Sequence, residues 1–145
     1  MSFLSAFNTS VSGMTAQRQR VNTISENIAN AETTRTPQGG PYRRREVILA
    51  SVANDRTFEE ELLSQDRSVS TSTEVKVVGI VQDERPPILR FEPGHPDANE
   101  EGYVEMPNVN IMEEMVNLMS ANRSYEANTA AFNATKNMVQ SALDL

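Results

Sequence analysis

Apolar residues recur every seven positions near both ends of this chain. The members of the repeat are Phe7, Met14, Val21 and Ile28 near the N-terminus and Ile111, Leu118, Tyr125, Phe132 and Val139 near the C-terminus. A seven-residue apolar repeat keeps one side of a helix facing a partner helix through a left-handed supercoil. Polar residues such as Ser10, Arg18 and Asn122 interrupt the flanks of both repeats. The repeats therefore predict two helices whose narrow apolar sides, the helix seams, form assembly contacts.

Further apolar residues lie three or four positions from the seams and are expected to widen them. They are Leu4, Val11 and Ile24 in the first segment and Met115, Met119 and Leu143 in the second. Four of the seven methionines, Met112, Met115, Met119 and Met138, fit the packing of the C-terminal helix. We expect them in a core rather than in an adaptable binding groove. A monomeric helical hairpin would produce similar stripes, so the pattern alone leaves both interpretations open.

The ends of the two predicted helices are marked by turn-forming and capping residues. The first helix is expected over residues 4–30, before residues 33–41, which are rich in Pro, Gly and Thr. The last helix is expected to start near Val109. Asn110 can cap it, and Glu113 can reach back in a capping-box geometry.

Between the helices, β-branched residues predict a small β region. The expected strands are residues 46–53, 73–81 and 88–91. One or two helical turns are expected over residues 57–64, and a loop over residues 92–102. We therefore predict an α+β fold in which the N- and C-terminal helices pair as an antiparallel, coiled-coil-like hairpin beside a small β-containing module.

Charge supports the same division of the chain. Residues 35–108 hold 9 Lys or Arg and 14 Asp or Glu, which is 23 of the 33 charged residues. We expect residues 1–34 and 108–145 to supply the two helices of an inner core domain. Residues 35–107 are expected to form a turn-rich link and a water-facing outer module. Low charge on a helix indicates that more than one of its faces is covered in the final assembly.

Composition excludes several classes of protein. A net charge of -7 and a sequence pI of about 4.7 argue against binding to nucleic acid or anionic lipid. No apolar run approaches the ~20 residues that span a bilayer, so direct membrane insertion is not expected. The first charged residue is Arg18, and no continuous apolar run follows an early basic residue, so we expect no cleavable signal peptide. Cysteine is absent, which excludes disulfides and thiolate sites.

The side chains that could act in catalysis or bind a metal do not form a recognisable catalytic or metal site. His95, the single histidine, lies in a loop without a nucleophile motif beside it, which indicates a turn or interface residue. Residues 97–102 resemble the first half of an EF-hand calcium loop, but the twelfth position is Asn108 instead of the bidentate Glu. The acidic run at residues 59–61 and the basic run at residues 43–45 are typical of solvated faces. We therefore predict no cofactor, no metal and no catalytic residue.

Two sequence stretches carry a specific resemblance. Residues 25–44 contain Ser-Glu-Asn-Ile-Ala-Asn-Ala and then Gly-Gly-Pro-Tyr-Arg, and residues 108–128 contain Asn-Val-Asn-Ile-Met-Glu-Glu-Met and later Arg-Ser-Tyr-Glu-Ala-Asn. Together these stretches resemble the signatures of flagellar rod and hook proteins, and more narrowly of a proximal-rod member. The motif residues are Asn27, Ile28, Ala29, Asn30, Gly39, Gly40, Pro41, Tyr42, Arg123, Tyr125 and Asn128. From the residues alone, Asn27 and Asn30 are expected to end the first helix. Residues 50–90 carry no such signature.

The resemblance implies a structural subunit of the flagellar basal body. Such a chain is exported unprocessed from the cytoplasm by the flagellar type III apparatus and polymerises in the periplasm into the rod, which transmits torque from motor to hook. Its implied partners are copies of itself, other rod proteins, and rod-base, MS-ring and hook-basal-body components. A helical filament requires heterologous contacts that do not close on themselves, and two interrupted seams on each subunit can supply them.

Two other functions are compatible with parts of the pattern. One is a soluble coiled-coil adaptor that binds a partner helix without polymerising. The other is an enzyme regulated through its helices, which would require an activity that depends on His95.

Overall fold

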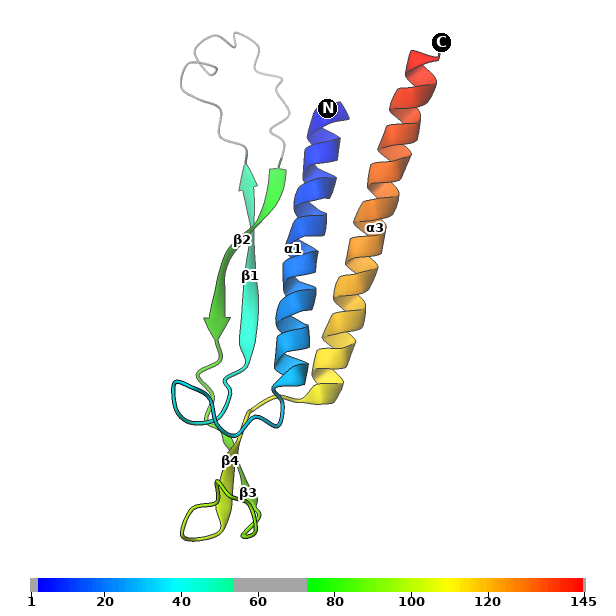
Figure 1. The fold of residues 1–145 in the computed structure, drawn as a ribbon. Helices are drawn as coiled ribbons and strands as arrows, with labels where there is room; N and C mark the ends of the chain where they lie inside the picture. The colour runs from blue at the N-terminus through cyan, green and yellow to red at the C-terminus, as the bar shows by residue number, and fades with distance from the viewer. Residues whose placement is uncertain (1–2, 54–72, 145) are drawn as a thin grey trace, which may run out of the picture.

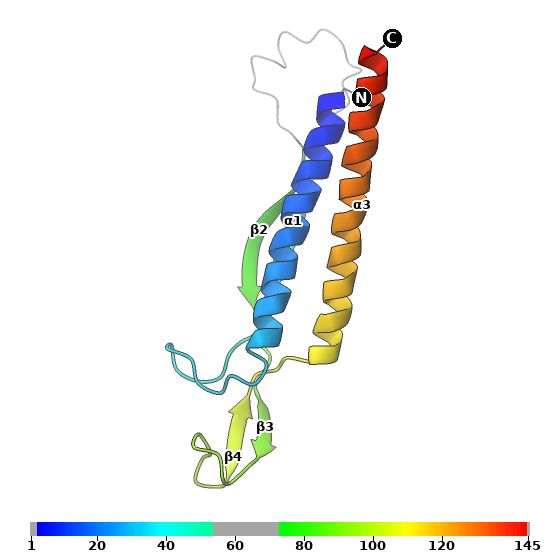
Figure 2. The same ribbon diagram turned by 45° about the vertical axis from the view of Figure 1, so that its right-hand side comes forward.

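The computed structural model describes residues 3–53 and 73–144. Two long antiparallel helices stand side by side, with a two-stranded ribbon along one of them and a short hairpin beyond their lower end (Figure 1, Figure 2). In chain order the elements are α1 (Phe3–Ala29), β1 (Arg45–Ala53), β2 (Thr73–Gln82), β3 (Ile88–Phe91), β4 (Tyr103–Met106) and α3 (Ile111–Leu143). The predicted α+β class and the antiparallel pairing of the terminal helices are therefore confirmed.

The end of α1 and the start of α3 lie within two residues of the positions expected from the sequence. At the end of α1, the Asn30 backbone N–H and its side-chain amide both donate to the Glu26 carbonyl, at 3.0 and 2.9 Å. At the start of α3, the Asn110 side-chain oxygen accepts from the backbone N–H groups of Met112 and Glu113, at 3.1 and 3.5 Å. Asn30 therefore closes α1 and Asn110 caps α3. The predicted capping box is wrong, because the described part of the chain holds no hydrogen bond from the Asn110 N–H to the Glu113 carboxylate.

The β1–β2 ribbon packs along α1. Its antiparallel register runs from Arg45 opposite Gln82 to Ala53 opposite Thr73, with an irregularity between Ile48 and Leu49. At one end it bonds directly to the helix, because the Val75 N–H donates to the Ser12 hydroxyl at 3.2 Å. The predicted strands at residues 46–53 and 73–81 are confirmed. The helical turns expected over residues 57–64 and the acidic run at residues 59–61 lie outside the described residues.

The second pair of strands, β3 and β4, forms a separate antiparallel hairpin. The prediction of β3 at residues 88–91 is confirmed, whereas β4 was missed because it has only four residues after a long loop. The rings of Phe91 and Tyr103 meet across the hairpin in a T-shaped contact at 5.3 Å. A hydrogen bond of 2.8 Å from the Thr34 hydroxyl to the Asp97 carboxylate connects this hairpin to the segment after α1.

Many large apolar side chains on the helices face outward. Met112, Met115, Met119 and Met138 are 72, 46, 58 and 56% exposed, so the expectation that they fill a core is wrong for the single chain. Of the residues expected to widen the seams, Ile24 is buried, but Leu4, Val11 and Leu143 are exposed. The helices pack through one narrow side, and that geometry leaves these residues on other faces. Neither α1 nor α3, within the described residues, is long and apolar enough to cross a membrane.

Candidate assembly interface

The residues of the predicted seams lie along the contact between the two helices or at its edges. Phe7, Met14, Val21, Ile28, Leu118, Phe132 and Val139 are half-buried, and Ile111 and Tyr125 are exposed. The rings of Phe7 and Phe132 meet at 5.0 Å in a T-shaped arrangement. The Thr129 hydroxyl lies 3.4 Å from the sulfur of Met14. The seams thus pair with each other in part, and much of their surface stays accessible.

Apart from Ile24, small and polar residues occupy the most buried positions of the helix pair. These residues are Ser10, Ala16, Thr23, Ile24 and Asn27 on α1 and Glu114, Ala121 and Thr135 on α3. A sequence signal for the α3 set exists, because Glu114, Ala121, Asn128 and Thr135 also recur every seven positions. Each follows a seam residue by three positions, as the second core position of a heptad does. The apolar pattern alone overlooked this set because its members are not large hydrophobes.

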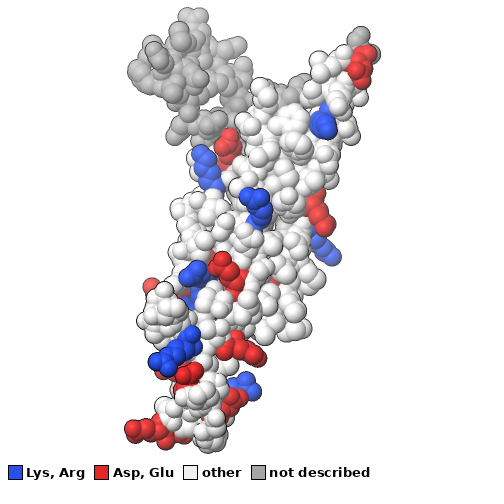
Figure 3. Space-filling view, in the orientation of Figure 1, with Lys and Arg blue, Asp and Glu red and all other residues white. Residues whose placement is uncertain are grey.

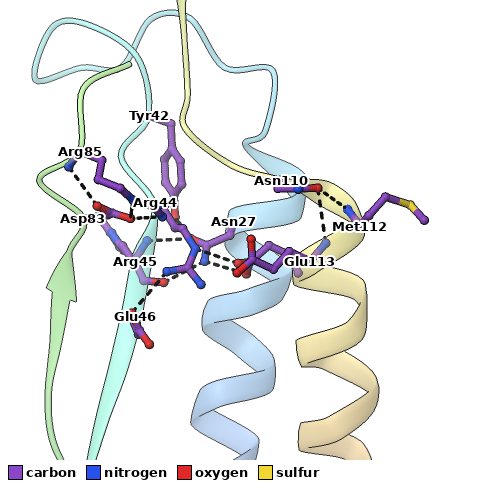
Figure 4. Close-up of polar contacts among 11 residues, drawn as sticks. Asn27, Tyr42, Arg44, Arg45, Glu46, Asp83, Arg85, Asn110, Met112 and Glu113 are labelled. Carbon is purple, nitrogen blue, oxygen red and sulfur yellow. Dashed lines mark hydrogen bonds and ion pairs between the residues drawn. The ribbon is translucent and has the colours of Figure 1, made fainter. Parts of the chain in front are cut away.

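Asn27 is the centre of a buried polar cluster that joins three segments of the chain (Figure 4). It is fully buried. Its side-chain amide donates to the Arg45 carbonyl at 2.8 Å and to a Glu114 carboxylate oxygen at 3.1 Å. Its side-chain oxygen accepts from the Tyr42 hydroxyl and the Arg45 N–H, both at 2.9 Å. The expectation that Asn27 serves to end α1 is therefore wrong, since it holds α1, β1 and α3 together.

Arg44 and Glu114 form a largely buried ion pair within this cluster. The Arg44 Nε donates to a Glu114 oxygen at 2.8 Å, and the two side chains are 15% and 1% exposed. Burial opposes the charge on Arg44, but its hydrogen bond to Glu114 and the nearby carboxylates outweigh burial and raise the pKa of the guanidinium. The prediction that the whole basic run at residues 43–45 is a solvated face fails at Arg44. No feature of the sequence indicated that a carboxylate 70 positions away would face Arg44.

The turn after α1 positions Tyr42 and Arg44 within the polar cluster. Gly39 and Gly40 have φ values of 88° and 74°, a left-handed conformation that favours glycine. The Thr36 N–H donates to the Gly40 carbonyl and the Tyr42 N–H to the Thr33 carbonyl, at 2.9 and 3.0 Å. Burial, with further contributions from Glu26 and Glu114, raises the pKa of the Tyr42 hydroxyl, which keeps it a donor. The motif from Gly39 to Tyr42, including Pro41, thus shapes this turn.

The C-terminal motif residues divide between the contact and the outer surface. Asn128 lies against Gly13 of α1, and its amide donates to the Ser124 carbonyl at 2.9 Å. Arg123 is exposed and makes no ion pair within the described residues. At the end of α1, Ile28 is half-buried and Ala29 is exposed.

In the loop between β3 and β4, polar side chains accept hydrogen bonds from the backbone of the loop itself. The Asp97 N–H donates to the His95 Nδ1 at 3.1 Å, which makes His95 a turn residue as predicted. The Asn99 side-chain oxygen accepts from the N–H groups of Glu101 and Tyr103, at 3.1 and 2.8 Å. This oxygen therefore serves the loop backbone.

The chain matches known flagellar proteins over its whole length. Residues 7–35 match the family described as flagella basal body rod protein, and residues 100–145 match the C-terminal family of the flagellar basal body rod FlgEFG proteins. A flagellar basal-body rod protein FlgC of Borreliella burgdorferi is 43% identical, over 99% of this chain and 97% of that protein. FlgC of Bacillus subtilis is 44% identical, over 100% and 99%. FlgC of Escherichia coli is 38% identical, over 100% and 98%.

These relatives are structural proteins, and they agree with the sequence motifs at both ends of the chain. The polar cluster holds the helix pair and β1 together. The chain belongs to the FlgC family of flagellar basal-body rod proteins and is a structural rod subunit, not an enzyme.

Proposed function

We propose that this protein polymerises through the outward faces of α1 and α3 into the periplasmic rod, which transmits torque from motor to hook. In this proposal residues 1–34 and 108–145 form the inner core domain, and residues 35–107 form a link and an outer module. The flagellar type III export apparatus carries the chain from the cytoplasm. Its partners are copies of itself, other rod proteins, and rod-base, MS-ring and hook-basal-body components.

The observation that carries the proposal is the character of the uncovered helix surface. Residues 3–17 of α1 carry no charged side chain, and residues 127–143 of α3 carry one, Lys136. Charged residues are correspondingly sparse over the upper helices in Figure 3 and gather lower on the molecule. Exposed apolar residues in a surface depleted of charge are typical of the centre of a protein interface. We infer that subunit contacts cover this surface.

A deletion experiment tests the proposed function in cells. An in-frame deletion, complemented from a plasmid, is expected to abolish rod, hook and motility and to recover all of them on complementation. Electron microscopy of isolated basal bodies is the measurement. Normal basal bodies in the deletion strain would contradict the rod function and favour a helix-binding adaptor.

A substitution on the exposed side of α3 tests the interface itself. Met119→Asp places a charge on a side chain that is 58% exposed, so we expect the single chain to fold but the rod to fail. The matched control is Ser120→Asp, an exposed neighbour on another face of the same helix. Circular dichroism checks folding, and motility with electron microscopy checks assembly. Equal effects of the two variants would contradict the proposed interface.

A further inference from the structure

Among the described residues, two sides of helix α1 contact other elements of the chain, and a third side does not. One side contacts α3, as the Phe7–Phe132 ring contact shows. A second side contacts the β1–β2 ribbon through Ser12. The third side is exposed and contains a seven-residue repeat of Leu4, Val11, Arg18 and Ser25. Arg18 is the one charged residue of this repeat and makes no ion pair within the described residues.

Helix α3 carries a matching exposed repeat on a side turned away from α1. This repeat consists of Met119, Glu126, Asn133 and Gln140, also at seven-residue spacing. Glu126 is its one charged residue and has no ion-pair partner among the residues described by the structure. Both repeats therefore have the same period, and their charges are opposite in sign.

The two repeats are complementary when the helices run antiparallel. If Arg18 faces Glu126, then Val11 faces Asn133, Leu4 faces Gln140 and Ser25 faces Met119. Each large apolar side chain then meets a small or amide side chain, as interdigitating helix surfaces require. One further pair follows from the same alignment, because Ala29 of α1 then lies opposite Met115, which is 46% exposed.

We propose that the exposed repeat of α1 binds the exposed repeat of α3 of a second copy, antiparallel, with Arg18 paired to Glu126. The inference rests on the proposed polymerisation and names the surfaces that carry it. Copies that point the same way along a rod place α1 of one copy antiparallel to α3 of the next, because the two helices are antiparallel within each copy. The contact joins two different surfaces, so it extends from copy to copy without closing on a pair.

The register agrees with that of the helices inside one copy. Within the chain Asn27 meets Glu114, and Gly13 lies against Asn128. The alignment of Arg18 with Glu126 differs from this by only three residues, or about 4.5 Å of helix rise. Neighbouring copies therefore lie nearly level, in a row where α1 and α3 alternate. Because the proposed contact repeats the α1–α3 contact of the single chain in nearly the same register, we infer that the partner on this surface is a second copy of the protein.

Cysteine cross-linking tests the register, since the chain has no cysteine of its own. Deletion cells express two versions of the protein, one with Asn22→Cys and one with Asn122→Cys, positions that face each other in the proposed alignment. Oxidation of isolated basal bodies is expected to give a cross-linked dimer. The control pairs Asn22→Cys with Asn137→Cys, which lies about 22 Å farther along α3. A disulfide requires Cα atoms within about 7 Å, so the control yield should be about tenfold lower.

Equal yields from both pairs, or cross-links to a different rod protein alone, would overturn the inference. In either case, complementation of motility by the unmodified gene would still support the rod function. Failure of the proposed helix contact can therefore be distinguished from failure of the proposed rod function.

Charge reversal tests the Arg18–Glu126 pair independently. Arg18→Glu or Glu126→Arg alone brings like charges together and is expected to reduce cross-linking and swimming about fivefold or more. The double variant restores opposite charges, and its values should return to within about twofold of the unmodified protein. Lys76→Glu, which reverses the charge of an exposed residue on β2 outside both repeats, is the control. A double variant as defective as the two single variants would refute the pairing.

Discussion

At the residue scale, Asn27 shows why a buried position in a helix pair is not always apolar. Its amide group has both donor and acceptor atoms, and four hydrogen bonds satisfy them without solvent. A leucine of similar size would leave the Arg45 N–H and the Tyr42 hydroxyl without partners. Buried polar groups without hydrogen-bond partners lower the stability of the fold. The donors and acceptors around position 27 therefore favour asparagine there.

Glu114→Ala should destabilise the protein strongly, because it leaves Arg44 largely buried without its carboxylate. We expect the free energy of unfolding to fall by about 3 kcal/mol in urea denaturation. The double variant Arg44→Met with Glu114→Leu should lose less, because it removes both charges. Glu126→Ala on the exposed face of α3 is the control and should change little. A small effect of Glu114→Ala would mean that the ion pair contributes little to the fold.

The Asp83 carboxyl should titrate at unusually low pH. Hydrogen bonds from the Arg85 side chain and backbone lower its pKa to about 2 from the usual 3.8. Since the folded-state pKa is below that of the unfolded chain, the stabilisation is present above about pH 4 and is lost as the pH falls towards 2. The effect on stability is small because Arg85 is well exposed. NMR titration of Arg85→Ala should move the pKa back towards 3.8, and an unchanged value would refute this cause.

At the element scale, the start of α3 depends on a single side chain. Asn110→Ala removes the acceptor for the Met112 and Glu113 N–H groups and should lower the free energy of unfolding by about 1 kcal/mol. Asn110→Asp keeps an acceptor and should retain most of the stability. Hydrogen exchange should rise first at Met112 and Glu113. Equal protection in both variants would indicate that tertiary contacts, rather than the cap, hold this end.

The close approach of α1 and α3 depends on Gly13. A Cβ atom at this position would lie 3.0–3.1 Å from the side-chain atoms of Asn128. Gly13→Leu should therefore force the helices apart and lower the free energy of unfolding by about 2 kcal/mol, despite the better helix propensity of leucine. Thr15→Leu, on the exposed side of α1, is the control. Thermal unfolding of the two variants is the measurement, and similar midpoints would contradict this role.

Most elements could be predicted from the sequence because their signals are local. Asn110 marks the start of α3, and the β-branched runs mark β1 and β2. The contact between the helices was predicted less well, because it depends on Ala121 and Thr135 rather than on large apolar residues. The pairing of Arg44 with Glu114 could not be predicted, since each residue looks like an exposed charge until the fold brings them together. The outward methionines were misassigned because helical periodicity does not say whether the same chain covers a face.

At the scale of the whole molecule, α1 is the common support for the larger parts. It contacts α3 on one side and the ribbon on another, whereas the β3–β4 hairpin stands beyond the helix ends (Figure 2). The link to that hairpin includes the Thr34–Asp97 hydrogen bond and the Arg35–Asp97 ion pair at 4.0 Å. The hairpin is therefore attached more weakly than the ribbon.

Asp97→Ala should loosen the hairpin without unfolding the molecule. It removes the acceptor for Thr34 and the partner of Arg35. Within the described residues, no hydrogen bond or ion pair joins Asp97 to α1 or α3. We expect NMR order parameters to fall in β3 and β4 while the unfolding midpoint changes by less than about 2 °C. Glu100→Ala, an exposed residue in the same loop, is the control. A large drop in the midpoint would show that the hairpin stabilises the whole chain.

The bond between Asn27 and Glu114 spans 87 positions of the sequence. A ribosome makes α1 first, yet the carboxylate that completes the surroundings of Asn27 emerges only when more than three quarters of the chain exists. The contact between Asn27 and Glu114 therefore forms only after the start of α3 has been made. Contacts between residues so far apart in sequence form slowly, because a long loop of chain must close first. Incomplete chains lack this polar partner, so the hydrogen bonds of Asn27 can be completed only after Glu114 has been synthesised.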